Sequence, residues 1–256
     1  MAMAQDKYAT RLLEPNVFCQ RISTAADLDA LLHCLHSSSI PFPLIVKPVY
    51  GWASEGVCKV HNEESLQDAV KRLWQASFTA KHGREVVVES YVDGPEIDAN
   101  MVLVDGEVIF YETNDEFPSP GDKNDFTQFD NFVEISNMIP SALPKDKIEV
   151  TRQKLHESAL KMVFRNGVFH MEARVRDSAW QYEENNGLMD LLPKPKTMNR
   201  TPDTFLLEAN PRAPGMQETA ATARAYGVSY RSLGLLNAIA DWPRMKALSV
   251  PFCGGA

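Results

Sequence analysis

The chain has 256 residues, of which 44% are hydrophobic and 23% are charged, and this is enough chain to bury a sizeable core. The net charge of −8 argues against a surface for nucleic acid or for anionic lipid. No apolar run reaches the roughly 18 residues of a membrane span, and Asp6 and Arg11 lie where a signal peptide needs an apolar core. The four cysteines form no CxxC pair, so we expect reduced thiols in a cytoplasmic protein, with a disulfide as the alternative.

The first 92 residues alternate between strand and helix patterns. Asp6 is expected to cap a short helix, and Thr24 with Asp27 forms a capping box for a second one. Asn62 is expected to cap a third helix that continues to about Ser77. The strands predicted for this region cover residues 16–22, 43–49, 57–60 and 85–92.

Hairpins dominate the sequence after residue 92. Asp105-Gly106 is a two-residue turn signal and predicts a hairpin of strands 97–104 and 107–112. Residues 114–130 are predicted as a polar loop, and residues 177–203 as a long insertion that is either a surface loop or disordered. Further strands are expected over 131–136, 168–175 and 204–210, and helices over about 145–165, 217–226 and 229–240. These patterns predict an α/β (α+β) fold of two mixed lobes, 1–92 and 93–256.

The segment 51–56, GWASEG, is rich in small residues, so its backbone N–H groups can approach an anion closely. It begins with P-loop spacing but continues with Val57-Cys58, which excludes a P-loop, and it is not GxGxxG. A tight hairpin is the alternative. Lys47 lies in an apolar strand and would lose hydration unless it met an anion, for which the adjacent loop offers a place. A lysine that reaches solvent from an edge strand is the alternative.

The strand VFHMEARV carries three polar side chains on one face. Period two puts His170, Glu172 and Arg174 together. No cysteine or second histidine has suitable spacing for a zinc site with His170, which we expect to pack or to hydrogen-bond nearby.

The strand FLLEAN carries a second carboxylate. Period two puts Leu206, Glu208 and Asn210 on one face, and Arg212 follows the strand. A carboxylate in an apolar run needs a cation, and glutamate and asparagine oxygens suit Mg²⁺. Salt bridges from the two glutamates to Arg174 and Arg212 are the alternative.

The run VVVESYVDGPE ends a strand at Glu89–Val92 and can offer backbone groups to a purine, while Glu96 can accept from ribose hydroxyls. An ordinary strand end explains this run as well.

Taken in order, these features resemble the ATP-grasp superfamily, which includes biotin carboxylase, D-alanine–D-alanine ligase, bacterial L-amino-acid ligases and carnosine synthase. The resemblance extends from about Asp6 to Ala240 and implies an ATP-grasp fold with ATP between two lobes. The segments FHMEAR and LLEANPRAPG look closest to the amino-acid-ligase branch.

The resemblance implies a role for each matching residue. Lys7 and Lys47 match the two phosphate-binding lysines, and Glu96 matches the acidic residue that binds ribose. Arg212 matches the arginine that steadies the acyl phosphate or the tetrahedral intermediate, so Arg212 and Lys47 are the implied catalytic residues. The loop over the phosphates is matched by Gly51, Ala53, Ser54, Gly56 and Val57, and the adenine-binding hinge by Glu89, Ser90, Tyr91 and Val92. The implied ligands of Mg²⁺, with Mn²⁺ as an alternative ion, are Glu172, Glu208 and Asn210.

The sequence departs from the family pattern in two places. The insertion 177–203 separates the two glutamates further than usual, and only six residues precede Lys7, where members carry an N-terminal subdomain that helps to hold the acceptor. A fragment, a truncated homologue and one half of a two-chain enzyme all fit this pattern. A homo-oligomer or a partner chain would then supply the missing subdomain.

The resemblance implies an ADP-forming carboxylate–amine ligase that uses ATP and Mg²⁺ and works through an acyl phosphate. Small-molecule carboxylates and amines would be its partners, without nucleic acid or membrane. A non-catalytic ATP-binding subunit that needs a partner chain is the first alternative. The second is an α/β protein that binds no nucleotide and uses its lysines and glutamates as surface pairs.

Overall fold

The computed structural model describes residues 2–14, 16–122, 131–195 and 202–252, which divide into two compact units. The first unit comprises Ala2–Val92 and Pro118–Glu134, and the second comprises Asp93–Phe117 and Ile135–Ala256. One division between the units therefore falls at residue 92, whereas residues 118–134, expected in the second lobe, belong to the first unit. In the described part of the chain, no helix combines the length and the apolar character that a membrane crossing needs.

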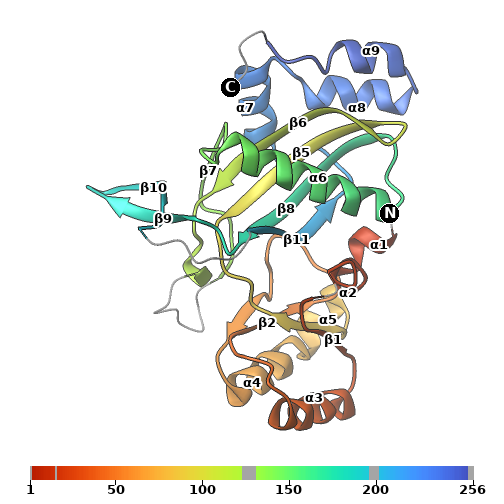
Figure 1. The fold of residues 1–256 in the computed structure, drawn as a ribbon. Helices are drawn as coiled ribbons and strands as arrows, with labels where there is room; N and C mark the ends of the chain where they lie inside the picture. Colours follow the sequence, from red (N-terminus) through yellow and green to blue (C-terminus); the bar gives the residue numbers. More distant parts are fainter. Residues whose placement is uncertain (1, 15, 123–130, 196–201, 253–256) are drawn as a thin grey trace. The chain divides into compact units, whose positions relative to one another are not determined.

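The first unit is built on an antiparallel four-stranded sheet in the order β1-β4-β2-β3 (Figure 1). Its strands are β1 (Cys19–Ile22), β2 (Leu44–Pro48), β3 (Cys58–Val60) and β4 (Val86–Ser90). Its described helices are α1 (Ala2–Gln5), α2 (Lys7–Arg11), α3 (Ala25–Ser37), α4 (Glu63–Leu73), α5 (Ala76–His82) and the 3-10 turn η1 (Pro120–Asp122). Leucines of α3 and α4 pack with valines of β2 and β4 in one apolar core, which fixes the sheet against these helices.

The predicted helix starts of the first unit are confirmed. Asp6 caps α2, and Thr24 and Asn62 form capping boxes at α3 and α4. Two helices replace the single helix expected from Asn62 to Ser77. Helix α4 ends at Leu73, and the backbone of Gln75 is extended before α5 begins. Cys19, Cys34 and Cys58 are free thiols, and Cys253 lies outside the described residues, as do Pro15 and residues 123–130.

The second unit is built on an antiparallel five-stranded sheet in the order β11-β8-β5-β6-β7. Its strands are β5 (Glu96–Val104), β6 (Glu107–Glu116), β7 (Asn137–Met138), β8 (Gly167–Arg176) and β11 (Asp203–Asn210). Its described helices are α6 (Lys145–Lys161), α7 (Met216–Tyr226), α8 (Tyr230–Ala238) and α9 (Trp242–Ala247). The predicted hairpin around Asp105-Gly106 is confirmed as β5–β6.

The two faces of this sheet differ in character. Helix α6 packs on the face that carries Met171 and Ala173, where Thr151 hydrogen-bonds Thr204 over 3.0 Å. Helix α8 packs on the opposite face, over the end that carries Val102 and Val168. Figure 1 shows α6 and α8 with the sheet strands. The remainder of the α8 face carries the polar side chains described below.

Several expectations for the second unit need correction. Residues 131–136 form no strand, and β6 continues instead to Glu116 and pairs with β7. Helix α6 ends at Lys161 rather than near residue 165, because Val163 has a φ of 65°, which a right-handed helix does not adopt.

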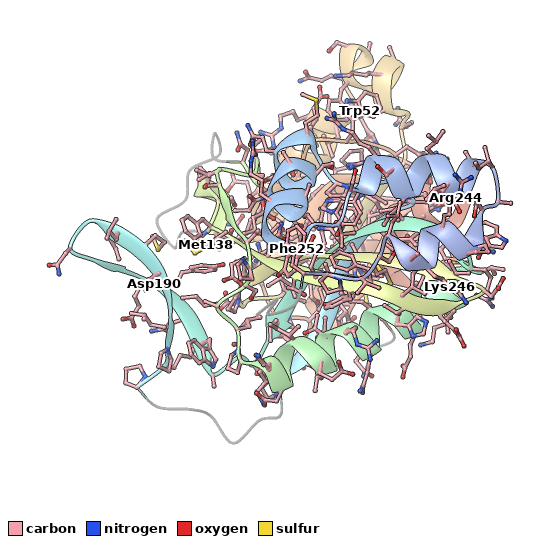
Figure 2. The ribbon with its side chains drawn as sticks, turned by 90° about the horizontal axis from the view of Figure 1, so that it is seen from above. Trp52, Met138, Asp190, Arg244, Lys246 and Phe252 are labelled. Carbon is pink, nitrogen blue, oxygen red and sulfur yellow. The ribbon has the colours of Figure 1, made fainter. Side chains whose placement is uncertain are left out.

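The insertion 177–203 is neither a loop nor disordered in its described part. It forms a hairpin of β9 (Trp180–Asn185) and β10 (Leu188–Pro193). The hairpin closes through Asn186-Gly187, with φ values of 53° and 78°, as a two-residue turn of this type requires. Figure 2 labels Asp190, on the hairpin that extends away from the five-stranded sheet. Residues 196–201 lie outside the described part.

Candidate functional site

A buried ion-pair cluster of Arg11, Lys47 and Glu89 lies in the first unit. Lys47 Nζ donates to Glu89 Oε1 over 2.7 Å, and Arg11 Nε donates to Glu89 Oε2 over 2.7 Å. The three side chains are between 0% and 8% exposed. Burial alone would raise the pKa of the Glu89 carboxyl, but the two cations lower it to about 2. Two cations and one carboxylate leave a net positive charge, which suits a site for phosphate.

The position of Lys47 corrects one of the two expectations for this residue. Strand β2 is an interior strand, so Lys47 does not reach solvent from an edge. Its partner within the chain is Glu89, burial lowers the pKa of Lys47, and the expected contact with an anion stays a prediction. The side chain of Glu89 is therefore occupied by two cations, and its expected place in an adenine-binding hinge stays a prediction.

The loop 51–57 is anchored at both ends. Lys7 Nζ donates to the Gly51 carbonyl over 2.8 Å, and Glu55 pairs with Lys81 and His82 of α5. Gly56 has a φ of 79°, and a Cβ at this position would lie 2.5 Å from Phe78 Cζ. Ala53 and Ser54 also have positive φ, both 52°. The loop is thus a fixed turn, and the roles of Gly51, Ala53, Ser54, Gly56 and Val57 at phosphates stay predictions.

Tyr91 anchors the strand end that follows β4. Its backbone N–H donates to the Pro43 carbonyl over 3.2 Å, so this N–H is already used within the first unit. Its hydroxyl donates to Asp122 Oδ1 over 3.1 Å. Lys59 Nζ lies 4.2 Å from the Tyr91 ring centroid and donates to the Gly121 carbonyl over 3.3 Å. Lys59 is a buried cation that the sequence patterns did not single out, and the roles of Ser90 and Val92 stay predictions.

In the second unit, a β-bulge brings the two predicted metal-binding glutamates together. The register of β11 against β8 shifts between Leu206 and Glu208, so that Glu208 faces Glu172 directly across the strands. Leu206 lies opposite Ala173 on the other face of the sheet. The expectation that Leu206 and Glu208 share a face is therefore wrong, because the bulge reverses the alternation between them.

The residues expected to hold Mg²⁺ fit that ion. Glu172, Glu208 and Asn210 lie on one face of neighbouring strands, and Asn210 Nδ2 donates to Glu172 Oε1 over 3.3 Å. Glu172 has a 31% exposed side chain, so its carboxylate is accessible to an ion. Two carboxylates and an amide oxygen are ligands that Mg²⁺ accepts, with other positions left for phosphate and water.

Glu96 lies opposite Arg174 on the same sheet face. Arg174 Nε and Nη2 both donate to Glu96 Oε2, over 2.8 Å and 2.6 Å. Arg174 thus pairs with Glu96, whereas the alternative expected it to pair with a metal-binding glutamate. The role of Glu96 at a ribose stays a prediction.

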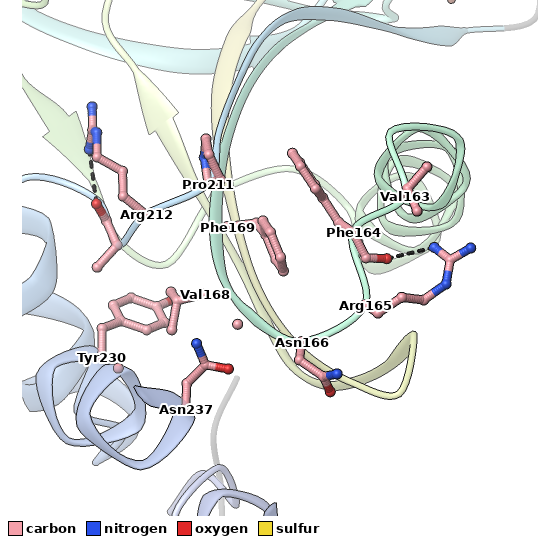
Figure 3. Close-up of a pocket in the computed structure, with 13 residues that line it drawn as sticks. Val163, Phe164, Arg165, Asn166, Val168, Phe169, Pro211, Arg212, Tyr230 and Asn237 are labelled. Carbon is pink, nitrogen blue, oxygen red and sulfur yellow. Dashed lines mark hydrogen bonds between the residues drawn. The ribbon is translucent and has the colours of Figure 1, made fainter. Parts of the chain in front are cut away.

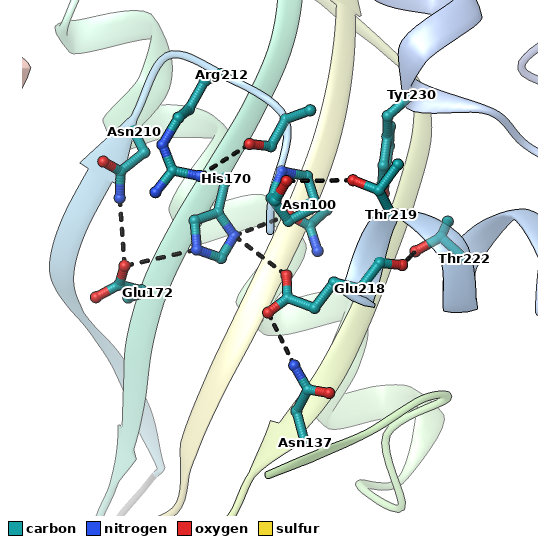
Figure 4. A network of polar contacts seen from close by, with 12 residues as sticks. Asn100, Asn137, His170, Glu172, Asn210, Arg212, Glu218, Thr219, Thr222 and Tyr230 are labelled. Atoms are coloured by element: carbon teal, nitrogen blue, oxygen red, sulfur yellow. Dashed lines mark hydrogen bonds and ion pairs between the residues drawn. The ribbon is translucent and has the colours of Figure 1, made fainter. Parts of the chain in front are cut away.

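Beside Glu172 lies a connected polar network around His170 (Figure 4). Asn100 Nδ2 donates to Glu112 over 2.7 Å, which fixes the amide so that Asn100 Oδ1 accepts from His170 Nδ1 over 2.9 Å. His170 Nε2 lies 3.5 Å from Glu172 Oε1, and Nδ1 lies 3.8 Å from Glu218 Oε2. The expectation that His170 hydrogen-bonds nearby is confirmed.

Burial sets the electrostatics of this network. It raises the pKa of Glu112 to about 7, although hydrogen bonds from Asn100 and Tyr230 oppose the rise. Burial, with Glu116 and Glu172 nearby, raises the pKa of Asp98 well above its usual range. For His170, burial alone would lower the pKa, but Glu172 and Glu218 raise it. The part of the sheet face around Asp98, Glu112 and Glu218 is thus acidic.

Arg212 follows β11 at the edge of a cavity of about 600 Å³ (Figure 3). Its Nη1 donates to the Ala213 carbonyl over 2.9 Å. Phe164, Phe169 and Tyr230 supply aromatic walls, and Asn237 supplies an amide. The cavity can take an organic ligand beside a guanidinium group, and the catalytic role of Arg212 stays a prediction.

The sequence reasoning assigned no role to Arg11, Lys59, Asp98, Glu112 or Glu218. A usable signal existed for Asp98, because EIDAN alternates Glu96, Asp98 and Asn100 with apolar residues on a strand. Arg11 belongs to the opening segment that resembles the ATP-grasp superfamily, but that resemblance gave a role to Lys7 alone, and no pattern indicated Glu218. The two residues join their clusters from helices α2 and α7.

Comparison with known proteins gives consistent matches. The family model of the ATP-grasp domain matches residues 40–189. The ATP-grasp enzyme fsqD of Aspergillus fumigatus is 39% identical over 234 residues, which cover 90% of this chain and 40% of that protein. Carnosine synthase 1 of Gallus gallus is 26% identical over 165 residues, which cover 60% of this chain and 16% of that protein.

Among solved structures, an L-amino acid ligase from Bacillus licheniformis superposes with a TM-score of 0.65 at 20% identity. The match covers 93% of this chain and 48% of that one, and it shows a shared fold. The chain spans less than half the length of each of these three proteins.

Proposed function

The chain belongs to the ATP-grasp family, and on this premise we propose that it carries the ATP-dependent site of an ADP-forming carboxylate–amine ligase that joins amino acids. The reaction would pass through an acyl phosphate. The chain spans less than half the length of these relatives, so the activity and the substrates of the whole protein are part of what we propose.

The observation that carries the proposal is the direct pairing of Glu172 with Glu208 across β8 and β11. Two carboxylates directly opposite each other destabilise a strand pair, because their like charges repel. A divalent cation bound between them removes the repulsion. Asn210, which contacts Glu172, supplies a third oxygen ligand.

The chemistry proposed for the site is a phosphoryl transfer followed by an acyl transfer. A substrate carboxylate oxygen attacks the γ-phosphorus of ATP, and the bond to the ADP oxygen breaks. The amine nitrogen then attacks the acyl carbon, and inorganic phosphate leaves. Mg²⁺ held by Glu172, Glu208 and Asn210 would supply charge neutralisation at the phosphates.

Cationic side chains of the chain would offset the negative charge that develops during these two steps. Lys47 is held in place by Glu89, and Lys7 is held by the Gly51 carbonyl, so both are fixed before any ligand binds. We propose that they bind phosphate oxygens, and that Arg212 steadies the charge that develops at the acyl group. The loop 51–57 would exclude water, which otherwise hydrolyses an acyl phosphate.

The experiment is a phosphate-release assay of the full chain with Mg-ATP and pairs of amino acids. We expect ADP, phosphate and a dipeptide in equal amounts. Glu208→Gln should reduce turnover about a hundredfold or more, because it removes a metal-binding charge, while Glu149→Gln on α6 serves as the exposed control. Full turnover by Glu208→Gln in a folded protein would contradict the metal assignment.

A nucleotide-binding subunit without catalysis of its own is the second candidate. It would show thermal stabilisation by Mg-ATP but no ADP release until a partner chain is added. Steady turnover by the purified chain alone would exclude it.

A further inference from the structure

Three buried carboxylates in the second unit keep one oxygen without a hydrogen-bond partner. Asp98 Oδ1, Glu112 Oε2 and Glu218 Oε2 have none among the described residues, although these residues are only 2% to 4% exposed. We call these three residues the acid cluster. A buried carboxylate oxygen without a donor costs free energy, so such a group indicates a missing partner.

Several donors around the acid cluster are already used, and the amide of Asn114, opposite Asp98 on β6, has no hydrogen-bond partner either. Tyr230 Oη and Thr222 Oγ1 both donate to Glu112 Oε1, and Asn137 Nδ2 donates to Glu218 Oε1 over 2.8 Å. Figure 4 shows Glu218 and Asn137 on the far side of His170 from Glu172. No described group donates to the second oxygen of any of these carboxylates, so a ligand that carries N–H donors would satisfy them.

The geometry favours an ammonium group over a metal ion as that ligand. Asp98, His170 and Glu218 place one potential ligand atom each within 4.8 Å of one another. His170 Nδ1, however, carries the proton that Asn100 Oδ1 accepts, and Nε2 faces Glu172, so neither nitrogen offers a lone pair to an ion within the acid cluster. A primary ammonium has N–H donors and one positive charge, which suit the neighbouring carboxylates of Asp98 and Glu218.

We propose that the acid cluster binds the ammonium group of the amino acid whose carboxylate is activated. Asp98 lies directly opposite Glu172 across β5 and β8. Glu218 lies on the other side of His170 from Glu172, at 3.8 Å from Nδ1, while Glu172 lies 3.5 Å from Nε2. An ammonium group bound at Asp98 would therefore bring the carboxylate of the same amino acid close to Glu172. The choice of an activated carboxylate rests on the proposed function, but the binding of the ammonium group does not.

The test measures binding by calorimetry on the full chain with Mg-ADP present. The probes are the twenty standard L-amino acids and β-alanine, each paired with the carboxylic acid that lacks its amino group. We expect at least one amino acid to bind and its amine-free partner to bind at least tenfold more weakly, the loss expected for a charge-assisted contact. Asp98→Asn should weaken that amino acid by about tenfold or more, and Asp146→Asn, an exposed aspartate on α6, should not.

Asp98→Asn is nearly isosteric, so it separates the proposed role from a structural one. Equal binding by wild type and by this variant would overturn the proposal, as would equal binding of the amine-free acids or no binding by any probe. If the acid cluster were a metal site, calorimetry would show Mn²⁺ binding without nucleotide, and Asp98→Asn would abolish that binding. This result would also overturn the proposal. Glu218→Gln is the second variant, with thermal melting to confirm folding.

The outcomes separate this inference from the proposed function. Amino-acid binding that depends on Asp98, without ADP release, would contradict the ligase and leave the ammonium site standing. ADP release with an unchanged amino-acid KM in Asp98→Asn would contradict the ammonium site and leave the ligase standing.

Discussion

The two units bury carboxylates in opposite ways. Glu89 of the first unit meets Arg11 and Lys47, and its pKa falls to about 2, whereas Glu112 of the second unit meets only neutral donors and its pKa rises to about 7. The first cluster has its charges paired within the chain and holds Lys47 in a fixed position. The second cluster retains acceptor oxygens to which no described group donates, as expected of a site that binds a ligand with hydrogen-bond donors.

The largest expected effect comes from breaking the paired cluster. Glu89→Gln leaves two buried cations without a countercharge, so we expect the free energy of unfolding to fall by about 3–5 kcal/mol. Chemical denaturation at pH 7 measures it. Glu149→Gln, which breaks an exposed pair with Arg152, should cost only a small fraction of this. A loss no larger than that of the control would show that the Glu89 cluster does not support the first unit.

The pH dependence of stability distinguishes the two units by sign. Glu112 has its pKa raised from 4.5 to about 7, so its contribution is fully present below pH 4.5 and is lost as pH rises to about 7, by about 3 kcal/mol at most. Glu89 contributes above pH 4.5 and loses this as pH falls toward about 2. Denaturation between pH 4.5 and 7 should show a fall in wild type that Glu112→Gln reduces. An unchanged slope in Glu112→Gln would contradict the charge environment described for the second unit.

A smaller effect of the opposite sign is expected at the acid cluster. Asp98→Asn removes a buried, unpaired acid, so the free energy of unfolding without ligand should stay equal or rise by about 1 kcal/mol at pH 7. Thermal melting against Asp146→Asn measures this. Marked destabilisation would mean that the Asp98 carboxylate has a stabilising partner. The difference in carboxylate pairing between the two units would then not hold.

Local rules predicted much of the fold. The capping boxes at Thr24 and Asn62 and the turn at Asp105-Gly106 depend on neighbouring residues, and all three are confirmed. The hairpin β9–β10 was missed although Asn186-Gly187 carries the same turn signal, because the polar composition of the insertion favoured a loop. The resemblance to the ATP-grasp superfamily is confirmed by the family match.

The site was harder to predict because it depends on register. Alternation placed Glu208 with Leu206, and only the bulge in β11 turns Glu208 toward Glu172. The partner of Lys47 comes from β4, which lies far away in sequence, and Glu218 comes from α7. Such contacts follow from strand order and helix packing, on which the spacing of residues along one segment carries no information.

The most direct test of the central claim is calorimetric titration of the full chain with a nonhydrolysable ATP analogue. We expect binding that requires Mg²⁺, that is weakened by Glu208→Gln, and that is unaffected by Glu149→Gln. Equal binding with and without Mg²⁺, or no binding by a folded protein, would contradict the claim that Glu172, Glu208 and Asn210 hold the metal ion of a nucleotide site.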